Sequence, residues 1–217
     1  MAQFHPQTLK FLSNLKKNNN KPWFDKNKPL YEAVRNDIIT IAAEVIKEVA
    51  KFDAAVSTVD PKKSVFRIYR DIRFSADKTP YKNNMGFWMA GGGLSSAGYY
   101  VHLQPGASFF GGGIWMPEAE KLAKIRQEID YNFSDFKKII SAPAFKKTFG
   151  ELSTESKLSR PPKNYDENNP AIEYLKLKSF TCGTKLSDAQ VMSPNFAKET
   201  AKAFKAMYPF IKFLNNA

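Results

Sequence analysis

Apolar residues recur at helical spacing in two long segments, one near each end of the chain. In residues 29–49, leucine, valine and isoleucine follow one another at intervals of three and four, the period of a helix with one buried face. Residues 196–211 carry a similar pattern, with a bend expected before Pro209. Shorter helical patterns begin at Pro6, Pro117 and Ser134.

Between these segments the apolar period changes to two, which predicts strands at residues 64–70, 84–90, 99–104 and 108–115, with a further strand at 175–180. Glycine and proline turns connect them, and such short connections favour antiparallel pairing. The order of elements predicts an α+β fold, with a mainly antiparallel sheet over about residues 64–115 packed with N-terminal and C-terminal helices. We expect residues 1–217 to form a single domain, with a polar connection at 151–170.

Composition narrows the class of protein. The 217 residues are 43% hydrophobic and 25% charged, which excludes wholesale disorder. No apolar run approaches the roughly 18 residues of a membrane span, so no membrane partner is expected. The stretch from Met1 to Pro6 has no signal-peptide pattern, which predicts a cytoplasmic protein. The single cysteine, Cys182, excludes an internal disulfide and a multi-cysteine zinc site.

The formal net charge is +12, and the excess is densest at residues 61–90, with seven basic and two acidic side chains. A strand continuing to Arg73 would place Arg70 on its apolar face, because side chains alternate. Burying an unpaired charge is very costly. We therefore expect the strand to end or bulge there, or Arg70 to have a partner. Asp71, Asp77 and glutamates of the long helix are the candidates.

Cations outnumber carboxylates within this run. Five basic residues (Arg67, Arg70, Arg73, Lys78 and Lys82) meet two acidic ones, Asp71 and Asp77. A phosphate, sulfate or carboxylate ligand would relieve the repulsion, since arginine binds such anions through two parallel hydrogen bonds. The alternative interpretation is an ion-pair network that fixes the loop.

His102 lies on the polar face of the predicted 99–104 strand, beside Tyr100 and Gln104. It is a candidate proton shuttle or anion ligand, although the pattern favours a surface histidine. The glycine triplets at 91–93 and 111–113 match no phosphate-binding loop, so no cofactor is predicted. Glycines inside a strand pattern suggest a bulge or a close backbone approach. Asp71 and Asp77 alone make a poor two-metal site, so no metal is predicted either.

The run from Arg67 to Tyr81 resembles the motif R-x-x-R-D-x-R-F-x-x-x-[DN]-K-x-x-Y. That motif is typical of a widespread family of uncharacterised bacterial proteins, a domain of unknown function with fungal relatives. The surrounding sequence is similar too, including Trp23-Phe24, Gly98-Tyr99-Tyr100 and Gln104-Pro105-Gly106. The resemblance covers nearly the whole chain and implies no activity.

The sequence favours binding of a small anionic ligand, preferably a phosphorylated one. Arginines and Lys78 would hold the anion, the aspartates would orient the arginines, and Tyr81 would donate a hydrogen bond. The candidate ligand-binding residues are Arg67, Arg70, Asp71, Arg73, Asp77, Lys78, Tyr81 and His102.

Three alternatives stay open. The net charge and the exposed tyrosines allow nucleic-acid binding, although no nucleic-acid-binding signature is present. A metal-independent phosphoryl-transfer or hydrolytic enzyme would use Tyr81 or His102 as nucleophile or acid/base group. The third is an interaction module in which the motif is purely structural. The oligomeric state is left open by the sequence.

Overall fold

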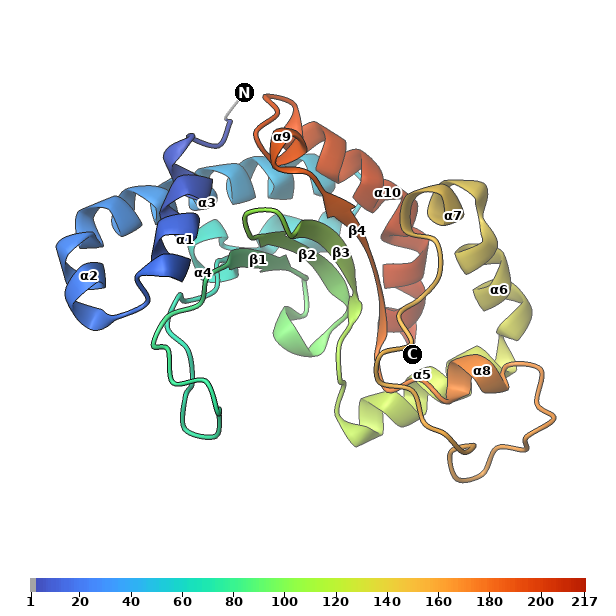
Figure 1. The fold of residues 1–217 in the computed structure, drawn as a ribbon. Coiled ribbons are helices and arrows are strands. Elements are labelled where there is room, and N and C mark those ends of the chain that lie inside the picture. The colour runs from blue at the N-terminus through green and yellow to red at the C-terminus, as the bar shows by residue number, and fades with distance from the viewer. Residues whose placement is uncertain (1–2) are drawn as a thin grey trace. The chain divides into compact units, whose positions relative to one another are not determined.

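The computed structural model describes residues 3–217, so the first two positions of the amino-terminal stretch considered above lie outside the described residues (Figure 1). The fold is α+β, with a four-stranded antiparallel sheet in the order β1-β2-β3-β4. The strands are β1 (Met85–Met89), β2 (Gly98–Leu103), β3 (Ser108–Ile114) and β4 (Phe180–Leu186). The predicted fold class is confirmed.

Helices precede, interrupt and follow the sheet. Before β1 lie α1 (Gln7–Lys17), α2 (Lys21–Lys26), α3 (Lys28–Val49), the 3-10 helix η1 (Ala54–Thr58) and α4 (Pro61–Ser64), and η2 (Gly93–Ser95) lies between β1 and β2. Between β3 and β4 lie α5 (Ala119–Tyr131), α6 (Phe133–Ser141), α7 (Pro143–Phe149) and α8 (Ile172–Leu175); α9 (Asp188–Val191) and α10 (Phe196–Asn216) follow β4. None of the described helices is long and apolar enough to cross a membrane.

The chain forms two compact units, each built from separate stretches of sequence. One contains the chain up to residue 89 with residues 100–110 and 185–202, and the other contains residues 90–99, 111–184 and 203–217. One boundary falls at the end of β1, and the other four fall inside β2, β3, β4 and α10. The single domain expected for residues 1–217 stays a prediction.

Helical periodicity identifies the core of the first unit. On α3 the apolar residues at the predicted spacing from Val34 to Val49, among them Ile38, Ile41 and Val45, are buried, whereas Leu30 in the first turn is only partly buried. On α1 one face is buried in the same way, and Thr8 donates a hydrogen bond of 2.5 Å to Asp37 of α3. These two helices therefore form as their sequence pattern predicts.

Aromatic side chains dominate the core of the second unit. The ring of Phe136 on α6 lies 5.3 Å from that of Phe213 on α10, and Phe145 on α7 lies 5.7 Å from Phe210. Helix α10 continues through Pro209 to its end at Asn216.

The strand predicted at residues 64–70 is wrong. Residues 61–64 form α4 instead, because Pro61 suits a first helical turn and the Asp60 carboxylate accepts from the Lys62 N–H at 2.8 Å. Residues 65–70 make two isolated antiparallel bridges, Val65 to Phe87 and Tyr69 to Tyr81, instead of a strand.

The strand predicted at 175–180 is also misplaced, since α8 ends at Leu175 and β4 begins at Phe180. An asparagine starts the turn before α8, as the Asn169 side chain accepts from the Ala171 N–H at 2.8 Å. Short helices α2, α7 and α9 were not predicted. Each is set by local capping or by proline rather than by a long apolar period; in α2 the Asn20 side chain accepts from the Trp23 N–H at 3.0 Å.

The glycine triplet in β3 reflects close approach of neighbouring backbone, as the sequence suggested. A Cβ at Gly111 would collide with the carbonyl of Cys182, and one at Gly113 with the carbonyl of Phe180. Gly113 also has a φ of 119°, which side-chain-bearing residues rarely adopt. Gly111 and Gly113 are therefore explained by pairing of β3 with β4, whereas a Cβ at Gly112 would collide with the Gly98 carbonyl of β2 and with Met207 Sδ of α10.

We expect Gly113→Ala to lower the free energy of unfolding by about 2 kcal/mol or more, because it combines backbone strain with a steric clash. Gly106→Ala is the matched control, since Gly106 has a φ of 71° but open space around it; its cost should be about 1 kcal/mol. Urea denaturation measures both. Equal stability of the two variants would contradict the close-packing explanation.

Candidate functional site

The motif run forms a loop of the first unit whose two ends are paired with each other. Tyr69 and Tyr81 pair as an isolated antiparallel bridge, and the Arg70 N–H donates to the Pro80 carbonyl at 3.0 Å. Figure 1 shows the loop in teal between α4 and β1. Residues 70–80, called the motif loop below, are thus held closed at their base.

Arg70 is the central side chain of the motif loop. Its guanidinium forms an ion pair with Asp77 and donates to Thr79 Oγ1 at 2.6 Å and to Ser75 Oγ at 3.3 Å. The Thr79 N–H also donates to Asp77, at 2.9 Å. The hydrogen bond from Arg70, followed by those from Thr79, lowers the pKa of Asp77 from 3.8 to about 2. Arg70 therefore has a partner, and Asp77 is the candidate that provides it.

The tip of the loop holds a second, exposed pair. Arg73 donates to Asp71 through Nε at 2.9 Å and through Nη2 at 2.6 Å, and this bonding lowers the pKa of the Asp71 carboxyl. Lys78 Nζ donates to the carbonyl of Ile72 at 3.0 Å. Asp71, Arg73 and Lys78 thus make their contacts within the loop.

Tyr81 anchors the base of the loop. Its ring stacks on Phe24 of α2, with centroids 4.0 Å apart and planes 15° apart. The Asn19 side chain accepts from the Tyr81 N–H at 3.1 Å and donates to its carbonyl at 2.8 Å. The Tyr81 side chain is buried, and burial raises the pKa of its hydroxyl.

A pocket of about 470 Å³ opens beside the base of the motif loop. We call it the loop pocket. It is lined by Lys16, Asn19, Arg70, Asp77, Thr79, Tyr81, Lys82, Asn83 and Asn84. Three of these, Arg70, Asp77 and Tyr81, belong to the predicted site. The only carboxylate among the lining residues, Asp77, is already paired with Arg70.

Cations remain without carboxylate partners in and near the loop pocket. Among residues 3–217, neither Lys16, Lys82 nor Arg67 forms an ion pair, and Arg67 is exposed. Burial, and then repulsion from Arg67, lowers the pKa of Lys82. Arg67 also lowers the pKa of Asp71, but that carboxylate is bound by Arg73. Of the five cations in the motif run, Arg70 and Arg73 are paired with carboxylates, which leaves the excess charge on Arg67, Lys78 and Lys82. Lys78 is bound to a backbone carbonyl of the loop, and Lys16 adds a further cation at the pocket.

His102 does not line the loop pocket. It lies on β2, where its Nδ1 is 3.0 Å from the Tyr100 hydroxyl and its Nε2 is 3.1 Å from Gln104 Oε1. Its ring stacks on Phe109 at 4.7 Å, and burial lowers its pKa below 6.5. The predicted division of β2 into a buried apolar face and a polar face is confirmed.

Outside the loop pocket, the described residues provide neither a metal-binding cluster nor a reactive cysteine. Across the described residues, no three His, Cys, Asp or Glu side chains lie close enough together to hold a metal ion. Cys182 is buried, and burial raises the pKa of its thiol to about 12. Neutral thiols are poor nucleophiles, so Cys182 is best described as a packing residue.

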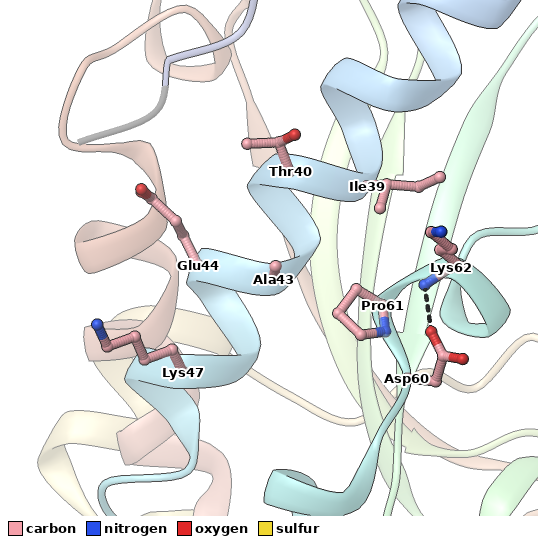
Figure 2. A pocket seen from close by; sticks show the side chains of 8 residues that line it. All are labelled: Ile39, Thr40, Ala43, Glu44, Lys47, Asp60, Pro61 and Lys62. Atoms are coloured by element: carbon pink, nitrogen blue, oxygen red, sulfur yellow. Dashed lines mark hydrogen bonds between the residues drawn. The ribbon is translucent and has the colours of Figure 1, made fainter.

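A second pocket, of about 640 Å³, runs along α3 opposite the start of α4 (Figure 2). Ile39 and Ala43 face Pro61 across it, while Lys47 extends along α3 at its rim. Basic and acidic side chains both line it, and it contains none of the predicted site residues. The loop pocket is therefore the better candidate.

The sequence analysis did not identify five of the lining residues, Lys16, Asn19, Thr79, Asn83 and Asn84. No sequence pattern links residues 18–20 to the segment some sixty residues later that Asn19 contacts. Lys82 was counted in the charge excess but not placed in the site.

Comparison with known proteins gives one match. The family model described as "Conserved hypothetical protein (DUF2461)" matches residues 7–213. No curated protein matches the chain, and no solved structure matches it.

The Arg70–Asp77 ion pair can be tested by measuring the pKa of the Asp77 carboxyl by NMR. Asp77 should titrate near pH 2, and Arg70→Gln should return its pKa towards 3.8. Because the folded-state pKa is depressed, the stabilisation from this pair should be complete above about pH 4 and lost as the pH falls towards 2.

Arg73→Gln is the matched control. It should raise the pKa of Asp71 and leave that of Asp77 near 2. A pKa of Asp77 that does not respond to Arg70→Gln would show that the pair does not hold the loop.

Proposed function

The chain belongs to the family described as conserved hypothetical protein (DUF2461), and that description names no activity. From the site itself, we propose that the loop pocket binds a small phosphorylated anion. One observation supports this above all. Lys16 and Lys82 line the pocket and Arg67 lies near Lys82, and none of the three has a carboxylate partner among residues 3–217.

A bound anion would reduce the desolvation and repulsion that disfavour the charged form of Lys82 in the free pocket. The pKa of Lys82 is lowered because its charged form is partly desolvated and repelled by Arg67. A phosphate group between these cations would stabilise both, since charge-assisted hydrogen bonds are roughly twice as strong as neutral ones. Binding is therefore expected to raise the pKa of Lys82 again.

The Arg70 guanidinium is preorganised for ligand binding by its ion pair with Asp77. Asp77 and Thr79 hold the Arg70 guanidinium in one orientation at the pocket wall. A guanidinium that is already fixed loses little conformational freedom when it donates to a ligand. In this proposal Asp71, Arg73 and Lys78 shape the loop, and the ligand is contacted from its base.

The size and lining of the pocket agree with a small polar ligand. A volume of about 470 Å³ lies within the usual range for small-molecule sites. The side-chain amides of Asn83 and Asn84 add hydrogen-bonding groups to the wall. Amides both donate and accept, so they suit phosphate oxygens together with the hydroxyl groups of an attached sugar.

The site favours binding over catalysis. The two candidates for a nucleophile or acid/base group were Tyr81 and His102. Tyr81 is buried against Phe24 with a raised pKa, and His102 lies outside the pocket. A catalytic site needs a nucleophile within hydrogen-bond reach of a base. These placements support a binding role for the loop pocket.

Lys82→Met tests the proposal. Methionine keeps an apolar stem beside Phe66 but removes the charge, so affinity for inorganic pyrophosphate should fall by about 10-fold, the equivalent of about 1.4 kcal/mol. Isothermal titration calorimetry at low ionic strength measures this.

Lys10→Met is the control, because Lys10 is an exposed lysine on α1 that does not line the loop pocket. Its affinity should stay within about 2-fold of the wild type. The proposal is contradicted if the wild type does not bind pyrophosphate, or if the two variants lose affinity equally.

A further inference from the structure

Aromatic rings gather around the partly exposed face of β2: two belong to β2, one to β3, and one to the segment that is hydrogen-bonded to β1 at Gly86. Phe66, Tyr100, His102 and Phe109 are all partly exposed there, and we call them the ring face. Along β2, buried residues alternate with these partly exposed ones. Partly exposed aromatic rings on a strand are available to stack against a flat ligand.

The rings of the ring face are held in defined positions. A Cβ at Gly86 would lie 2.7 Å from the Tyr100 hydroxyl oxygen, so this glycine allows the Tyr100 side chain to lie against β1. Gln104 Oε1 is an acceptor, so His102 Nε2 carries the proton and Nδ1 accepts from the Tyr100 hydroxyl. His102 in turn stacks on Phe109, with planes 19° apart.

Phe66 connects the ring face to the unpaired cations. Its N–H donates to the carbonyl of Gly86 at 2.9 Å, which fixes it beside β1. Lys82 Nζ lies 5.9 Å from the Phe66 ring centroid, and the Tyr100 ring centroid lies 6.1 Å away on the same face. Lys82 itself lines the loop pocket. Cations and rings are therefore neighbours within one unit.

We infer that the ligand is a nucleoside monophosphate. Its phosphate contacts Lys82 and its neighbouring cations in the loop pocket, and its base stacks on the ring face at Phe66 and Tyr100. This inference rests on the proposed function, and it adds the part of the ligand that an inorganic anion lacks. Stacking needs a flat π-system, and a nucleotide joins such a ring to a phosphate through a single sugar.

A mononucleotide fits better than a nucleic-acid strand. The unpaired cations, Lys16, Arg67 and Lys82, lie at one end of the ring face rather than along it. The far part of that face carries Gln104 and His102, whose side chains are already hydrogen-bonded to each other. A strand needs repeated phosphate contacts along a groove, and its binding falls steeply with salt.

Calorimetry with ribose 5-phosphate and AMP tests the inference. AMP should bind about 10-fold more tightly, since the base adds stacking. Tyr100→Leu should reduce the affinity for AMP to that for ribose 5-phosphate, whereas Tyr100→Phe, which keeps the ring, should preserve most of the difference. Lys82→Met should weaken both ligands to the same degree. Far-ultraviolet circular dichroism confirms that each variant is folded.

The outcomes separate the two proposals. Equal affinity of the wild type for AMP and ribose 5-phosphate overturns the nucleotide inference and leaves the anion site intact. If neither compound binds although pyrophosphate does, the nucleotide inference fails and the anion site stands; if pyrophosphate also does not bind, the proposed function fails and the inference fails with it. A ten-nucleotide single strand that binds far more tightly than AMP, with steep salt dependence, also overturns the inference, because it identifies a polymer as the partner.

Discussion

The guanidinium of Arg70 lies where the chain has just left the core at Ile68, and its charge has to be neutralised there. Asp77, seven residues further on, provides the carboxylate, and Thr79 and Ser75 accept further hydrogen bonds. This pairing folds the motif loop back on itself. It also uses up the only carboxylate lining the loop pocket, so Lys16 and Lys82 are left with an excess of positive charge. The loop and the anion site thus follow from one ion pair.

Much of the fold could be predicted from apolar spacing alone. The long helix α3 and strand β2 are each determined by a sustained period, and burial of their apolar residues agrees with it. The strand expected at 64–70 failed because local effects prevailed over the alternation. Asp60 and Pro61 start a helical turn, and the pairing of Arg70 with Asp77 bends the chain away. Capping and ion pairs act through single side chains, so periodicity does not reveal them.

The chemistry of the candidate site could be predicted from the sequence, but not all of the residues that form it. Charge counting identified the excess of cations over carboxylates, and the structure assigns that excess to Arg67, Lys78 and Lys82 rather than to Arg70 and Arg73. Asn19 lines the pocket because it is hydrogen-bonded to the backbone of Tyr81. A contact between positions so far apart depends on how α1 and α2 pack, and a single sequence holds no signal for it.

Anion binding by the uncompensated cations beside the Arg70–Asp77 pair can be observed in crystals soaked in tungstate, whose anomalous scattering identifies the ion. We expect an anomalous peak in the loop pocket, within hydrogen-bond distance of Lys82 Nζ and of at least one of Lys16, Arg67 and Arg70. Tungstate bound only at other surfaces, with the loop pocket empty, would contradict it.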